Sequence, residues 1–135
     1  MTTTRQKKPG GPSPIQSTSS ASAKIYWLNL EEVRSRLAKA TQDLAREHPE
    51  IAEVWLFGSL ARGQAVPGSD ADVLLVLDEC NLPFLDRSVH FQPEFCGVGV
   101  DLFAYTRQEL AQMEEAGHQF LQRVKGERVC LFRRA

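Results

Sequence analysis

Two short apolar segments enclose a glycine-rich loop and two closely spaced aspartates between residues 51 and 77. The first segment, Ile51–Phe57, is apolar at nearly every position and stops at Gly58. The second begins with Asp70 and Asp72 and continues as an apolar run to residue 77. Because apolar residues occupy both side-chain faces, each segment is predicted to be an interior strand. An α/β domain organised around these two strands is therefore expected.

The two aspartates are poorly suited to a buried strand unless they bind something. Side chains two positions apart along a strand point to the same face, so Asp70 and Asp72 are expected about 7 Å apart. Neighbouring carboxylates repel each other and are costly to remove from water. A hard divalent cation such as Mg²⁺ relieves both problems, because it prefers oxygen ligands and keeps positions open for phosphate oxygens. The pair therefore predicts a metal site.

The Gly58-Ser59 turn has the features of a phosphate site. Gly58 lets the backbone approach a ligand closely, and Ser59 is predicted to begin a short helix whose first N–H groups face anions. Arg62 and Ser69 border the loop between the two strands and are candidate phosphate contacts. A solvated Arg62 and a turn-forming Ser69 are the alternatives. Together with the aspartates, this turn predicts transfer of a phosphorus-bearing group from a nucleotide.

The same residues resemble the signature of the polymerase-β-like nucleotidyltransferase superfamily. The match consists of an apolar-Gly-Ser turn at 57–59, ten intervening residues, the Asp-x-Asp motif at 70–73, and a later strand that carries Asp101. Ala71 departs mildly, since the family usually has a larger aliphatic residue there. The resemblance covers residues 25–132. It implies a nucleotidyltransferase palm, in which a mixed sheet of three to five strands has helices mainly on one face.

The resemblance also implies the role of each site residue. Asp70, Asp72 and Asp101 are expected to hold Mg²⁺ and to act in catalysis, with Asp101 favouring deprotonation of the attacking hydroxyl. Gly58 and Ser59 are expected to bind the β- and γ-phosphates of a nucleoside triphosphate.

The remaining elements are predicted from apolar periodicity and from turn residues. Residues 25–28 form a short apolar stretch, and residues 30–48 form an amphipathic helix that Asn29 and Glu32 are expected to cap. A short helix at 83–91 and a third strand at 98–105 follow. Thr106 and Glu109 predict a second capping box, and Gly126 is expected to end a later helix as its C′ residue. A last short strand is expected at 128–132.

Charge divides the chain into a tail and a domain. Residues 1–24 contain four basic and no acidic residues, which leaves 12 basic and 17 acidic residues in the remainder of a chain of net charge −1. Residues 1–23 are rich in Ser, Thr, Pro and Gly and are predicted to be a disordered basic tail. Residues 24–135 are predicted to be the nucleotidyltransferase domain. Its mildly acidic balance argues against a large nucleic-acid surface.

Composition also indicates the cellular setting. No apolar run reaches the length of a membrane span, and the N-terminus lacks the apolar core of a secretory signal. The three cysteines show no Cys-x-x-Cys spacing, which favours reduced thiols over disulfides or a zinc site. A cytoplasmic protein is expected.

The family resemblance implies a Mg-dependent enzyme that moves a nucleoside monophosphate, AMP from ATP, to a hydroxyl acceptor. Residues after Phe132 leave no room for a helical acceptor domain, so the acceptor is expected from elsewhere. Similarity to small stand-alone family members implies an antitoxin that modifies a HEPN-type helical partner protein. Two alternatives stay open. One is transfer to a small molecule such as an aminoglycoside, with the site completed by a homodimer or partner. The other is a non-catalytic module that neutralises its partner by contact.

Overall fold

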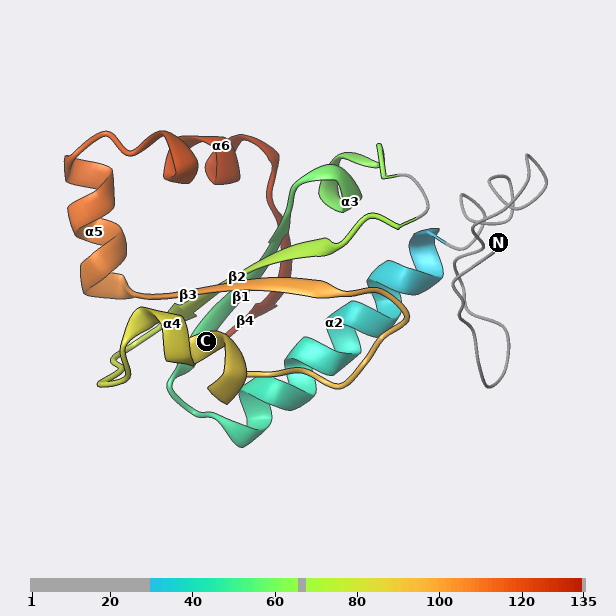
Figure 1. Cartoon of the computed structure of the whole chain (residues 1–135), viewed down its shortest axis with the longest axis horizontal. Coiled ribbons are helices and arrows are strands. Elements are labelled where there is room, and N and C mark those ends of the chain that lie inside the picture. The colour runs from blue at the N-terminus through green and yellow to red at the C-terminus, as the bar shows by residue number, and fades with distance from the viewer. Residues whose placement is uncertain (1–29, 66–67, 135) are drawn as a thin grey trace.

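The computed structural model describes residues 30–65 and 68–134 (Figure 1). The elements in chain order are α2 (Leu30–Glu47), β1 (Ile51–Phe57), α3 (Ser59–Arg62), β2 (Ala71–Leu77), α4 (Phe84–His90), β3 (Val100–Thr106), α5 (Arg107–Glu115), α6 (Gln119–Glu127) and β4 (Val129–Arg133). The strands form one sheet in the order β3-β2-β1-β4. β1 pairs antiparallel with β2 and β4, whereas β2 and β3 are parallel. The predicted α/β class and mixed sheet are confirmed.

The two faces of the sheet carry separate apolar clusters because strand side chains alternate. Val54 and Leu56 of β1 join the larger cluster, which includes buried residues of α2. Trp55 and Phe57 point the other way and join a smaller cluster with α6. Figure 1 shows α2 on one side of the sheet and α5 and α6 on the other. The helices thus cover both faces, with the larger core under α2, whereas the prediction placed the helices mainly on one face.

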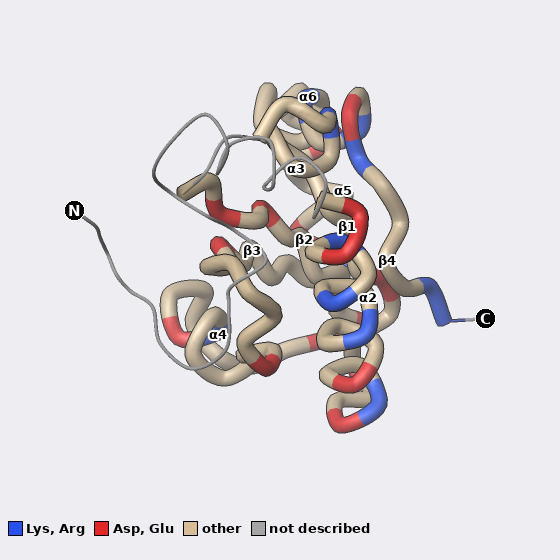
Figure 2. Tube along the Cα trace, turned by 90° about the vertical axis from the view of Figure 1, so that its right-hand side faces the viewer, with Lys and Arg blue, Asp and Glu red and all other residues tan. Residues whose placement is uncertain are grey.

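α2 combines a buried apolar stripe with a charged outer face. Its inner side buries Val33, Leu37 and Leu44, among others. Its outer side forms i,i+3 and i,i+4 ion pairs, which are Arg36–Glu32, Lys39–Asp43 and Arg46–Asp43. Acidic residues lie in the first turn of this helix and at Asp43 and Glu47, and its basic residues lie between them (Figure 2).

α4 covers the outer edge of β3 and ties it to α5. Arg87 of α4 is buried, and its Nη1 donates to the carbonyl of Ala104 in β3 at 3.0 Å. The same guanidinium forms two hydrogen bonds with Glu109, which lower the pKa of that carboxyl and keep it ionised. Thr106 and Glu109 form the predicted capping box. An exposed strand edge is a pairing hazard, and this arrangement occupies part of it.

The predicted strand boundaries lie within two residues of the observed ones. The predicted end of a helix at Gly126 is wrong. Gly126 does not end a helix as a C′ residue, because it lies inside α6, which continues to Glu127. Gly126 does not adopt a positive φ, so it has no left-handed cap conformation. The predicted tail, the stretch at 25–28 and the cap at Asn29 lie outside the described residues. Within residues 30–65 and 68–134, each helix is too short or too polar to cross a bilayer.

Candidate active site

The end of β1 and the beginnings of β2 and β3 meet at one end of the sheet. Because β1 runs antiparallel to β2, Phe57 at the end of β1 pairs with Asp72 near the start of β2. Because β2 runs parallel to β3, Asp72 pairs in turn with Asp101. Neighbouring strands lie about 4.8 Å apart, so the register holds these two carboxylates side by side. Alternation along the strands directs both to the face of the sheet that α6 covers.

Two glycines make room for the aspartates. Gly58 has a φ of +80°, and a Cβ atom at this position would clash with Oδ2 of Asp72. A Cβ atom at Gly99 would lie 2.6 Å from Oδ1 of Asp70. Asp72 therefore lies against the turn after β1, and Asp70 lies against the segment that leads into β3. The structure brings all three sequence-predicted carboxylates to the same end of the sheet.

This crowding perturbs Asp72. Burial raises its pKa above the ordinary value, and the charge of Asp101 raises it further. Arg123 opposes the shift, while Asp70 and Glu127 add smaller increases. The ionised form of Asp72 is thus held at a cost in folding free energy, and a cation at this position would remove that cost.

The carboxylates fit the metal that the family resemblance implies. The donor set consists of oxygen atoms alone, which matches a hard cation such as Mg²⁺ rather than a transition metal that prefers nitrogen or sulfur. The burial and the neighbouring charge of Asp101, which together raise the pKa of Asp72, are the conditions that a divalent cation relieves.

The predicted phosphate turn is present, and an internal anion occupies it. Ser59 begins the four-residue helix α3 as expected. The backbone N–H of Gly58 donates to Oε2 of Glu127 at 2.5 Å. Nη1 of Arg62 donates to both carboxylate oxygens of Glu127, at 3.0 and 3.1 Å. A carboxylate therefore lies where two of the predicted phosphate contacts converge.

Hydrogen bonds from Arg34 of α2 stabilise α3. Nε of Arg34 donates to the carbonyl of Leu60 at 3.0 Å, and its Nη2 donates to the carbonyl of Ala61 at the same distance. These carbonyls belong to the two central residues of α3, and a single helical turn leaves them without intrahelical partners. Arg34 therefore stabilises the turn that presents Gly58 and Ser59.

Sequence reasoning missed the contribution of α6. Arg123 lies with its guanidinium 5.9 Å from the centre of the Phe57 ring and acts electrostatically on Asp72. Glu127 is one helical turn further along and is largely buried. The i,i+4 spacing of these charges on a helix with buried Leu121 and Val124 was the available signal. Ser69 is half-buried beside Asp70, and its proposed phosphate contact stays a prediction.

Comparisons with known proteins identify the family of the chain. The family model described as nucleotidyltransferase domain matches residues 37–131. The protein adenylyltransferase MntA of Thermococcus cleftensis is 34% identical over 80 residues, which cover 58% of this chain and 79% of MntA. A proposed nucleotidyltransferase from Sulfolobus solfataricus superposes with a TM-score of 0.58 at 21% identity, over 83% of this chain and 88% of that one. A toxin–antitoxin structure with AMP-PNP has a TM-score of 0.47 at 19% identity, over 72% of this chain and 73% of that one.

Proposed function

The chain belongs to the nucleotidyltransferase domain family and is a homologue of MntA, and on this basis we propose that it transfers AMP from ATP to a hydroxyl of a partner protein. The observation that carries the proposal is the convergence of Asp70, Asp72 and Asp101 beside the Gly58 turn. The name of the relative, a protein adenylyltransferase, supports adenylyl as the group and protein as the acceptor.

Each residue then has a distinct task. Asp70, Asp72 and Asp101 would hold Mg²⁺, which when bound stabilises charge on the entering and leaving oxygens. The N–H groups of the turn at Gly58 and Ser59 would bind the terminal phosphates and direct the triphosphate toward the carboxylates. Asp101 would accept the proton of the attacking hydroxyl. The hydroxyl oxygen bonds to the α-phosphorus, the bond to the bridging oxygen breaks, and pyrophosphate leaves.

Under this proposal Glu127 competes with the triphosphate for Gly58 and Arg62. Replacing Glu127 with Gln removes the negative charge while keeping the size of the side chain. Because a hydrogen bond to a charged group contributes about 1.5–3 kcal/mol, its loss is expected to tighten Mg-ATP binding about tenfold. Isothermal titration calorimetry with Mg-ATP measures the change.

The matched control for this variant is Glu114→Gln, because Glu114 is exposed and pairs with Lys125, not with Gly58 or Arg62. This control should leave nucleotide affinity unchanged. Weaker ATP binding by Glu127→Gln would contradict the competition, since Glu127 would then be helping to hold the nucleotide.

A protein acceptor is supported by an exposed apolar surface at the edge of the sheet formed by β3, the strand that carries Asp101. Leu85 and Phe95 are each 83% exposed, and Val89 is 74% exposed. A shallow groove of about 620 Å³ runs from Val89 and Phe95 to Gly99 and Val100, which directly precede Asp101. We call this the α4 surface. Large exposed apolar side chains that gather in one place are typical of protein interfaces and are not needed for a small polar acceptor.

The test combines the chain, Mg-ATP and a HEPN-type helical protein as candidate acceptor, with intact mass spectrometry detecting the added AMP. The double variant Leu85→Ser and Phe95→Ser is expected to lower the rate of transfer to the protein at least about tenfold, because each lost anchor costs more than about 1 kcal/mol. Its affinity for Mg-ATP should not change.

Val129→Ser is the matched control, since Val129 is an exposed apolar residue on the opposite edge strand β4. An unchanged transfer rate in the double variant would exclude the α4 surface as the docking site. AMP transfer to an aminoglycoside in the absence of any protein would instead favour the small-molecule alternative.

A further inference from the structure

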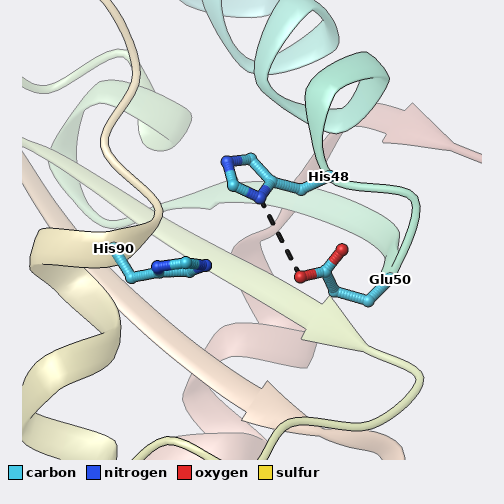
Figure 3. Close-up of side chains that lie close together, drawn as sticks. All are labelled: His48, Glu50 and His90. Carbon is cyan, nitrogen blue, oxygen red and sulfur yellow. Dashed lines mark ion pairs between the residues drawn. The ribbon is translucent and has the colours of Figure 1, made fainter.

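Two histidines and a glutamate meet at the opposite end of β1 from the nucleotide turn. His48 follows the end of α2, Glu50 directly precedes β1, and His90 is the last residue of α4. One ligand atom from each lies within 4.8 Å of the other two, and Nδ1 of His48 is 3.9 Å from Oε2 of Glu50 (Figure 3). We propose that these three residues bind a divalent transition-metal ion of the Zn²⁺ class, at a site separate from the predicted Mg²⁺ site.

The ligand set determines the class of ion. Two imidazoles and one carboxylate are a standard zinc donor set, whereas Mg²⁺ selects oxygen ligands alone. Zinc–ligand bonds of about 2.0–2.2 Å in a tetrahedron place neighbouring ligand atoms roughly 3.3 Å apart. The ligand atoms of His48, Glu50 and His90 lie up to 4.8 Å apart, and rotation of a side chain can bring them to the shorter distance. His90 is exposed, so it can turn inward and leave a fourth position to water.

The backbone already holds two of the three residues, His48 and Glu50, in place. The N–H of His48 donates to the carbonyl of Leu44 at 3.0 Å, which continues the pattern of α2. The carbonyl of Glu50 accepts from the N–H of Asp78 at 2.8 Å. These bonds anchor His48 and Glu50 on opposite sides of one tight turn. A ligand pair on such a turn loses little conformational entropy when it binds an ion.

Phe91 positions the two imidazoles relative to each other. Its ring is only 1% exposed and belongs to the larger core cluster. It meets the ring of His48 at 5.0 Å and the ring of His90 at 4.6 Å, both edge to face. The two histidine rings are themselves 5.2 Å apart. A bound ion would therefore join the C-terminal end of α4 to the turn between α2 and β1.

The site is independent of the proposed nucleotidyl transfer. It lies at the start of β1, whereas Gly58 follows the end of that strand, seven residues later. At about 3.3 Å per residue, the two ends are separated by roughly 20 Å. Metal binding can thus be measured without nucleotide, and its failure would leave the proposed function untouched.

The test is isothermal titration of the full chain with ZnCl₂, with Mg²⁺ in excess to occupy the aspartates. The background protein for these titrations carries both Cys80→Ser and Cys130→Ser, because the two thiols are free, are not buried and could bind Zn²⁺ themselves. One Zn²⁺ per chain is expected, with a rise in Tm and, for Co²⁺ in its place, visible absorption from the ligated ion. His90→Ala and Glu50→Gln should each lower Zn²⁺ affinity at least about 10–100-fold, because loss of even an outer-shell partner has that effect.

His118→Ala is the control, since His118 is an exposed histidine at the start of α6 and outside the cluster. It should bind Zn²⁺ as the background protein does. The proposal is overturned if the background protein binds no stoichiometric Zn²⁺, or if His90→Ala binds it with unchanged affinity. Equal loss in His118→Ala and His90→Ala would also overturn it, because the ion would then lie elsewhere.

Discussion

Asp72→Asn and Asp101→Asn are each expected to slow nucleotidyl transfer at least about 100-fold. Both carboxylates are predicted to hold the metal ions, and the register pairs them directly across β2 and β3. Loss of a metal ligand should exceed the 10–100-fold effect that removing an outer-shell partner has. Asparagine keeps the shape of the side chain, so circular dichroism should report an unchanged fold. A pyrophosphate-release assay with Mg-ATP and acceptor measures the rate.

Asp72→Asn should also stabilise the protein when metal is absent. Burial and the charge of Asp101 raise the pKa of Asp72 in the folded state above its ordinary value of 3.8. The folded state therefore binds a proton more tightly than the unfolded chain, and the stability due to this group is lost as pH rises through the folded pKa. At neutral pH without Mg²⁺, Asp72→Asn is expected to raise Tm. That difference should shrink at pH values below 3.8.

Asp78→Asn separates these effects from a general loss of negative charge. Asp78 follows β2 at the end of the sheet away from the site, is exposed and pairs with Arg107. It should leave both transfer and metal-free Tm nearly unchanged, because exposed ion pairs contribute little. Full activity in either Asp72→Asn or Asp101→Asn would remove that residue from the proposed catalytic set.

Gly58→Ala is expected to abolish most transfer and to destabilise the fold. Gly58 has a φ of +80°, a conformation that costs an L-residue about 1–3 kcal/mol. The added methyl group would also clash with Oδ2 of Asp72, so the carboxylate or the turn must move. The carboxylates and the phosphate-binding turn of the proposed site would shift relative to each other. A misplacement of about 1 Å can lower the rate about 100-fold. Pyrophosphate release and thermal unfolding measure the two effects.

Gly117→Ala is the matched control for backbone strain. Gly117 has a φ of +68° in the turn between α5 and α6, and a Cβ atom there would meet nothing within 4 Å. It should lower stability through the same left-handed penalty while leaving transfer intact. If Gly58→Ala retained full activity, the close approach of Gly58 to Asp72 would have no functional role.

Patterns of a few neighbouring residues were sufficient to predict an element where a single sequence feature determined it. β1 has the predicted bounds because a run that is apolar at every position except Glu53 ends at a glycine that adopts a positive φ. The capping box at Thr106 could be predicted because Thr106 and Glu109 lie three residues apart and each side chain accepts from the backbone N–H of the other. Gly126 failed as a helix terminator, because a glycine permits a left-handed cap without requiring one.

The sequence alone determined which residues could carry the proposed chemistry, since the types and spacing of Gly58, Asp70 and Asp72 and the later Asp101 already predicted a metal-dependent phosphate site. Only the tertiary structure decided what surrounds it. Glu127 reaches Gly58 from 69 residues away, and His48 meets His90 across the turn before β1. The partners in such contacts cannot be identified from a single sequence, because the contacts arise from the packing of whole helices on a sheet whose register sets their positions.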